Sequence, residues 1–157
     1  MTRQQILQLI FHGAMLVLLG MVSGYIYRFA ISSEWGPDQE RTWRILHTFM
    51  VQCGGLYIAI GAVGRYLTLT TRTGTFVVWS LALSAYTFAL GLVIAPLIGT
   101  RGLDPGSSLA AVAVFVNFVV SSAFGLAGVA VVVLGAFASL RRIGTSPRTS
   151  LNEGRDS

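Results

Sequence analysis

The chain has 157 residues, of which 54% are hydrophobic and 11% charged, and its mean hydropathy is +0.70. This composition excludes an ordinary soluble domain and indicates an integral membrane protein. The net charge of +5 comes from 11 arginines with no lysine, spread over the ends of apolar segments, so a nucleic-acid partner is not expected. The single cysteine, Cys53, cannot form an intrachain disulfide.

Four apolar stretches are long enough to cross the hydrocarbon core of a membrane, which takes roughly 20 residues. They run over Ile6–Tyr27, Ile45–Gly64, Thr75–Ile98 and Leu109–Leu140. The sequence therefore predicts an all-α fold, a bundle of four transmembrane helices over residues 1–142, followed by a disordered cytoplasmic tail over 143–157. No cleavage site follows the first stretch, so it is expected to remain as a helix.

The connections carry turn signals. In the first loop, expected over Ile31–Thr42, Gly36-Pro37-Asp38 marks a turn, after which QERTWR can form an amphipathic lead-in to the second helix. Trp35 and Trp43 are expected at a membrane interface, and Pro96 predicts a kink or stop in the third helix. Small residues in the fourth helix predict close helix packing, within the chain or between subunits: Ser121, Ser122, Gly125, Gly128 and Gly135.

The segment WRILHTFMVQCGG places an imidazole inside an apolar stretch. At helical spacing His47, Val51 and Gly54 share one face, with Met50 beside them, and the Gly54-Gly55 pair allows a flat, bulky group such as haem to approach the backbone. The alternative is a histidine near a helix end that bonds a neighbouring helix or interfacial water.

The second histidine, His12, lies about six residues into the first stretch, whereas His47 lies near the opposite edge of the membrane. Across a hydrocarbon core of ~30 Å the two are well separated, so both cannot ligate one iron in a single subunit. This disfavours a bis-histidine haem and leaves a haem with one histidine and an open axial position. His12 is expected to serve helix packing beside Gly13.

Three further intramembrane side chains are candidates for a site, each with a structural alternative. Asn117 either lines a pocket or bonds between helices. Cys53 is either near a substrate or an ordinary core residue. Tyr86 has a hydroxyl that either donates to a bound oxygen or finds a partner in the helix bundle.

The chain resembles the styrene oxide isomerases, small four-helix membrane enzymes that convert epoxides to aldehydes. The likeness spans about His12 to Leu140 and lies in HGAML of the first helix, in Trp43, His47 and Gly54, in RGL of Arg101–Leu103, and in AFGLAG with Gly135 of the fourth helix. The resemblance implies a homotrimer with haem b between neighbouring subunits and His47 as the axial ligand. It departs from the family at Cys53, where an asparagine is usual, and at Phe88 or Leu92, where a tyrosine is usual.

These observations combine into a site hypothesis. His47 is the expected iron ligand, with Trp43, Met50 and Gly54 beside the cofactor, and Cys53, Tyr86 and Asn117 are the expected substrate-side residues. The leading hypothesis is an isomerase in which ferric haem b acts as a Lewis acid on a small apolar epoxide, and a 1,2-hydride shift then gives the aldehyde. Phe49 and Phe88 are candidates to flank the developing cation.

Two other functional classes are alternatives to an isomerase. A non-catalytic haem b membrane subunit for electron transfer or gas sensing predicts a reversible redox couple and a partner protein. A small transporter is disfavoured, since the apolar stretches hold no Asp, Glu or Arg to couple ions.

Topology is a prediction that reporter fusions check. The termini and second loop carry seven arginines (Arg3, Arg65, Arg72, Arg141, Arg142, Arg148 and Arg155), against four on the first and third loops (Arg28, Arg41, Arg44 and Arg101). Because positive charge is retained on the cytoplasmic side of a bacterial-type inner membrane, both termini are expected to be cytoplasmic. A reporter fused at the C-terminus should read cytoplasmic, and one fused at Asp104 should read external. If both reporters read the same side, one of the four predicted membrane crossings is wrong.

Overall fold

The computed structural model describes residues 1–100, 102 and 104–145. Within these residues the chain forms helices and no strand: α1 (Arg3–Ser32), α2 (Pro37–Val63), the 3-10 turn η1 (Gly64–Tyr66), α3 (Thr71–Leu97) and α4 (Leu109–Thr145). All four α-helices are long and apolar enough to cross a membrane. The predicted all-α four-helix architecture is confirmed.

Local sequence explains where the helices begin. Thr2 and Gln5 form a reciprocal capping box at the start of α1, and the Thr70 side chain accepts a hydrogen bond from the backbone of Thr73 at the start of α3. At the start of α2, Gly36 adopts φ 98°, which favours glycine, and Pro37 takes the first helical position.

Two predicted boundaries shift. The first loop is shorter than expected, because Pro37 starts α2 at once and QERTWR lies inside that helix, leaving residues 33–36 as the connection. Pro96 does stop α3, which ends at Leu97. At the C-terminal end α4 continues to Thr145, three residues beyond the predicted domain boundary, and the remainder of the predicted tail lies outside the described residues.

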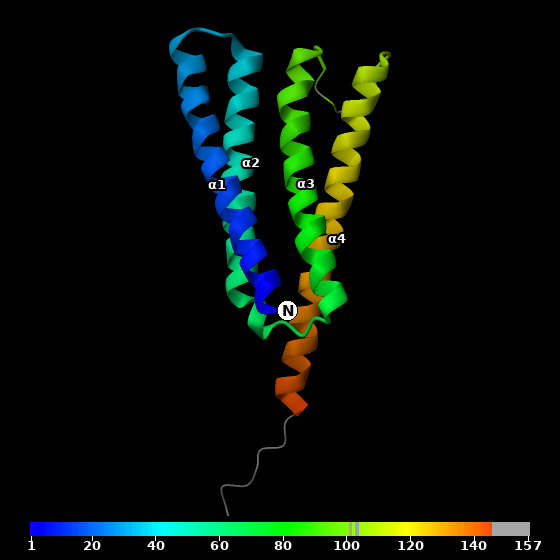
Figure 1. The fold of residues 1–157 in the computed structure, drawn as a ribbon. Helices are drawn as coiled ribbons and strands as arrows, with labels where there is room; N and C mark the ends of the chain where they lie inside the picture. Colours follow the sequence, from blue (N-terminus) through cyan, green and yellow to red (C-terminus); the bar gives the residue numbers. More distant parts are fainter. Residues whose placement is uncertain (101, 103, 146–157) are drawn as a thin grey trace, which may run out of the picture.

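The four helices form two hairpins, α1 with α2 and α3 with α4 (Figure 1). The hairpins lie close together at the end where residues 64–70 connect α2 to α3, which we name the closed end. They diverge toward the end that carries residues 33–36, 98–100 and 104–108, named the open end.

Glycines bring α1 and α2 into backbone contact. A Cβ atom added to Gly13 would lie 2.7 Å from the Gly54 carbonyl oxygen, and one added to Gly54 would lie 2.6 Å from the Gly13 carbonyl oxygen. Gly20 of α1 packs in the same way against Val51, and Gly61 of α2 against Ile10. Such contacts stabilise helix pairs in lipid, where apolar burial alone gives little driving force.

Hydroxyl and amide groups join α3 to α4. The Ser84 hydroxyl donates to the Ser121 carbonyl (2.6 Å), and the Thr87 and Ser121 hydroxyls are 2.6 Å apart. Gly125 of α4 packs directly on Ser84. The close packing predicted for the small residues of the fourth helix is therefore found within the chain.

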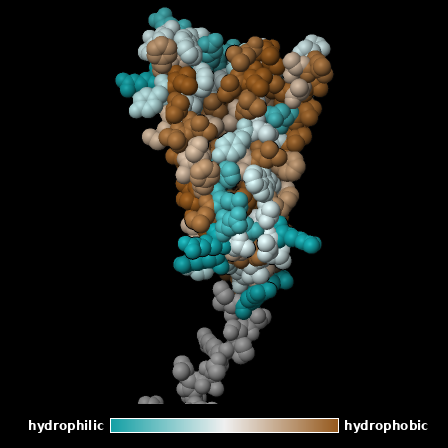
Figure 2. All heavy atoms as spheres, in the orientation of Figure 1, coloured by the Kyte–Doolittle hydropathy of each residue, from teal (hydrophilic) through white to brown (hydrophobic). Residues whose placement is uncertain are grey.

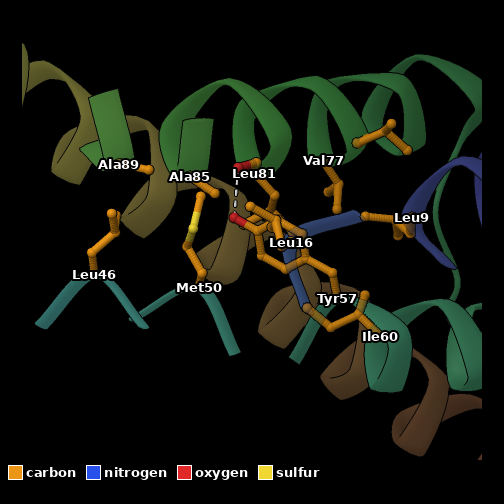
Figure 3. Packing of buried hydrophobic residues seen from close by; sticks show 11 residues of the cluster. Leu9, Leu16, Leu46, Met50, Tyr57, Ile60, Val77, Leu81, Ala85 and Ala89 are labelled. Carbon is orange, nitrogen blue, oxygen red and sulfur yellow. Dashed lines mark hydrogen bonds between the residues drawn. The ribbon is translucent and has the colours of Figure 1, made fainter. Parts of the chain in front are cut away.

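Side chains of both hairpins hold the closed end and the centre together. Gln5 Nε2 donates to the Thr71 carbonyl (2.7 Å) and the Thr75 hydroxyl (3.0 Å), and the buried Tyr57 hydroxyl donates to the Leu81 carbonyl (2.5 Å). Figure 3 shows the apolar core beside this bond, including Leu9, Leu16, Leu46, Met50, Val77, Ala85 and Ala89.

The outer surface is that of a protein in lipid. Large apolar side chains are exposed along the helices, such as Leu18, Leu90 and Leu126. Figure 2 shows hydrophobic residues over the sides of the helical part and hydrophilic residues at its two ends, with some hydrophilic residues also along the middle of this face. This distribution matches a hydrocarbon layer between two polar interfaces.

The α1–α2 contact predicts opposite responses at two neighbouring glycines. In Gly54→Ala the new methyl group meets the Gly13 backbone, so we expect a loss of about 1–3 kcal/mol, seen as a lower unfolding midpoint of the purified protein in detergent. Gly55 has no neighbour within 4 Å of an added Cβ, so Gly55→Ala should leave the midpoint unchanged or raise it. Equal losses in both variants would contradict this packing.

Candidate functional site

His47 of α2 packs against α1 with a defined orientation. Its Nδ1 lies 2.7 Å from the Gly20 carbonyl oxygen, which can only accept, so Nδ1 carries the proton and donates. A Cβ atom on Gly24 would lie 2.8 Å from the same nitrogen. Gly20 and Gly24, one turn apart on α1, therefore make the space in which the partly exposed imidazole sits.

This geometry leaves Nε2 with the lone pair. A histidine anchored through Nδ1–H to a carbonyl is the form in which proteins present Nε2 to a metal. The described residues contain no group of three or more His, Cys, Asp or Glu side chains that could enclose a metal ion. Within these residues His47 is thus not part of a cluster of metal-ligating side chains.

The predicted neighbours of the cofactor lie on several sides of α2. Trp43 is partly buried against the core, and Met50 is buried and packs toward Ala85 (Figure 3). The space over Gly54 is already occupied by α1, so within one chain this glycine serves helix packing. Of the Gly54-Gly55 pair, only Gly55 has no neighbour within 4 Å of an added Cβ atom, so a flat group has room to approach the backbone there.

Tyr86 is paired with the other histidine. His12 Nδ1 lies 3.3 Å from the Tyr86 hydroxyl, and the two rings meet edge to face at 5.8 Å. His12 precedes Gly20, the partner of His47, by eight residues, or ~12 Å along α1. The two histidines therefore form their bonds at different levels, as the sequence predicts.

Asn117 combines the two roles that the sequence left open. Its Nδ2 donates to the Thr87 carbonyl of α3 (2.9 Å), and the residue also lines a groove of about 460 Å³. Exposed Leu83 and Val120 border this groove, which places it on the outer face of α3 and α4. The third candidate, Cys53, is a free, partly buried thiol packed against the core.

A larger cleft, of about 810 Å³, lies between the hairpins at the open end. Its rim is polar (Asp38, Gln39, Arg41, Thr42), and its interior is largely apolar (Ile45, Phe88, Leu92, Phe115, Phe118 and Val119). Phe88 stacks on Phe49 with ring centroids 4.6 Å apart and lies 4.9 Å from Phe118. Sequence reasoning paired Phe49 with Phe88 as candidates to flank a cation but did not find the cleft, which combines residues of three helices and a loop.

The cleft and the imidazole lie on opposite sides of α2. Ile45 lines the cleft, and two residues further on the helix has turned by roughly 200°, so His47 points away from it toward α1. Tyr86 and Asn117 in turn bond to His12 and Thr87. One chain thus does not bring all the predicted site residues into a single pocket.

Fold and site together define a multi-pass, four-helix membrane protein in which one histidine, His47, is anchored through Nδ1 to a backbone carbonyl. The family model for styrene oxide isomerases matches residues 5–137, and the chain belongs to this family. No curated protein and no solved structure gives a significant match. Of the RGL segment of the resemblance, only Gly102 lies among the described residues.

Proposed function

We propose that this protein is a haem b-dependent epoxide isomerase of the membrane, which converts aryl epoxides such as styrene oxide to aldehydes. Membership of the styrene oxide isomerase family supports the reaction class. The observation that carries the haem assignment is the imidazole of His47, held by the Gly20 carbonyl with Nε2 left to bind.

The residues present fit such a group. His47 would supply the protein nitrogen to the iron, Gly20 would fix the tautomer, and Gly24 would keep the space around the ring clear. When bound, ferric haem would supply a Lewis acid for redox-neutral opening of the epoxide. With such a Lewis acid the epoxide ring would open at the carbon best able to carry positive charge, and a 1,2-hydride shift would yield the aldehyde without an added proton donor.

The contribution of the chain itself is to exclude water. Water would capture the cation and give a diol, so the aldehyde requires a dry site. The described residues contain no buried side-chain nitrogen or oxygen without a hydrogen-bond partner. Polar groups such as Ser84 and Asn117 are committed to neighbouring helices, which leaves apolar surface around a bound substrate.

We further propose a homotrimer with haem between neighbouring subunits, as the resemblance implies. A group held by His47 points away from the cleft of its own chain, which favours a site shared between copies in a closed ring. We place the protein in a bacterial-type inner membrane with both termini cytoplasmic, on the arginine distribution.

Among the proposed substrate-side residues, Cys53 lies on the same helix as Phe49, which stacks on Phe88. It follows Phe49 by one helical turn and so shares its face of α2. Tyr86 and Asn117 are the other two proposed substrate-side residues. The Tyr86 hydroxyl is hydrogen-bonded to His12, and the Asn117 amide donates to the Thr87 carbonyl. Cys53→Asn, which introduces the usual residue of the family, should keep or raise activity on styrene oxide.

The ligand assignment is tested by two histidine variants of the purified protein. His47→Ala should abolish haem retention, because it removes the proposed Nε2 ligand, while His12→Ala should retain haem. The Soret band and a pyridine haemochrome assay measure both. A protein that loses the Soret band with His12→Ala but keeps it with His47→Ala reverses the assignment.

The catalytic proposal is tested by oxidation state. The air-oxidised protein should convert aryl epoxides to aldehydes in detergent without a partner, and dithionite should suppress this turnover reversibly, since a Lewis acid weakens on reduction. A folded, haem-loaded ferric protein that yields no aldehyde from a panel of aryl and alkyl epoxides would sink the isomerase proposal. A reversible redox couple with no isomerisation would favour a non-catalytic haem subunit.

A further inference from the structure

One backbone carbonyl of α1 accepts hydrogen bonds from two side chains. The Gly20 oxygen lies 2.7 Å from His47 Nδ1, and it also accepts from the Ser23 hydroxyl at 2.7 Å. Ser23 follows Gly20 by three residues on the same helix, and only 3% of its surface is exposed. A buried serine and the anchored imidazole therefore share one acceptor.

The packing of the helices gives little reason for a serine at this position. The Ser23 hydroxyl bonds back to its own helix, whereas the hydroxyl of Ser84 bonds α3 to α4. In a helix interior serine is a weaker helix former than alanine, because its hydroxyl competes with the backbone for hydrogen bonds. What the Ser23 hydroxyl changes is the carbonyl that holds His47.

Ser80 of α3 is the same kind of serine without a histidine. It is also buried, with 4% of its surface exposed, and its hydroxyl also donates to the carbonyl three residues earlier, that of Val77, at 3.3 Å. Both histidines form their bonds elsewhere, His47 with Gly20 and His12 with Tyr86. Ser23 differs from Ser80 in its shorter bond and in the acceptor that it shares.

Two donors on one oxygen weaken each other. A carbonyl oxygen has two lone pairs, and each donor draws electron density from the oxygen, so the Ser23 hydroxyl makes Gly20 a poorer acceptor for Nδ1–H. The bond at Nδ1 sets the basicity of Nε2, because a stronger acceptor gives the ring more imidazolate character. Ser23 thus lowers the electron density that His47 can donate through Nε2.

We propose that Ser23 is a positioning residue that acts through the Gly20 carbonyl on His47 and keeps a ferric iron bound at Nε2 a stronger Lewis acid. The basicity of the axial ligand and the hydrogen bonds behind it are means by which a protein sets the electronic properties of haem iron. With less donation from its axial ligand, the iron draws more density from an oxygen bound opposite. The inference rests on the proposed function for the identity of the metal group.

The test measures the iron in the full-length purified protein with haem bound. Ser23→Ala leaves the Gly20 carbonyl to His47 alone, so the ferric form should be favoured over the ferrous by roughly two- to tenfold, the size of one hydrogen bond. This change is seen as a lower midpoint potential and a higher Fe–His stretching frequency in resonance Raman spectra of the ferrous form. Turnover of aryl epoxides should fall, while the unfolding midpoint in detergent should stay the same or rise.

Further variants connect the effect to the hydroxyl. Ser23→Thr keeps a hydroxyl that can bond to the preceding turn, and it should restore the midpoint potential. Ser80→Ala is the matched control, because it removes a buried serine with the same kind of bond from α3, and it should leave the potential and the Fe–His frequency unchanged. If Ser23→Ala does not fold, Ser23→Cys, whose thiol is a weak donor, provides the same comparison.

An unchanged potential and Fe–His frequency in folded Ser23→Ala, or equal shifts in Ser80→Ala, overturns the proposal and leaves Ser23 an ordinary serine of a helix interior. A shifted potential in Ser23→Ala, with no aldehyde from the unmodified protein, overturns the proposed function and retains the role of Ser23. Aldehyde production with no shift in Ser23→Ala retains the function and overturns that role.

A purified protein without haem overturns the proposed function, and NMR of its ¹⁵N-labelled histidines then decides the role of Ser23. His47→Ala assigns the signals. An Nδ1–H proton of His47 that moves downfield in Ser23→Ala, as a strengthened hydrogen bond requires, retains the shared acceptor. A proton that stays in place overturns it.

Discussion

The close approach of α1 and α2 determines what His47 can do. Gly13 and Gly54 let the two backbones touch, and the register that follows places the Gly20 carbonyl 2.7 Å from His47 Nδ1. If the helices stood further apart, the nearest partner of the imidazole would be lost and its tautomer would no longer be set by the backbone. The contact between Gly13 and Gly54, which have no side chains, thus sets the tautomer of His47, which lies one to two turns away on α2.

The second hairpin is held by a different kind of interaction, and the contrast accounts for the cleft. Hydroxyl and amide groups of Ser84, Thr87, Asn117 and Ser121 bond α3 to α4, so each hairpin has its own set of interhelix contacts. Between the hairpins, Gln5 and other polar side chains act at the closed end and the centre. At the open end, where the hairpins diverge (Figure 1), Phe49 stacks on Phe88 between them, and residues of α2, α3 and α4 line the cleft.

Sequence reasoning succeeded where a property is local to one helix. Length and hydropathy predict four helices, and spacing places Val51 and Gly54 on the face of α2 that does contact α1. A bond from His47 to a neighbouring helix was one of the two readings of the sequence, and the structure shows such a bond to Gly20. The identity of the partner was missed because it depends on the register between two helices, although Gly20 and Gly24, four residues apart, gave a signal for close packing. The cleft was missed because Phe49, Phe88 and Phe118 meet only after three helices are placed in space.

The pairing of polar groups inside the bundle bears on which reactions the protein can support. Hydrolysis by direct attack of water on the intact epoxide uses a bound water and a base directed at it. Here the hydroxyl of Tyr86 faces His12, the amide of Asn117 donates to Thr87, and Tyr57 donates to Leu81. These groups are committed to the fold, so positioning a water molecule would break bonds that hold helices together. The rearrangement in the proposed function keeps every atom of the substrate and needs no positioned water, but it would need the Lewis acid that a haem held by His47 would supply.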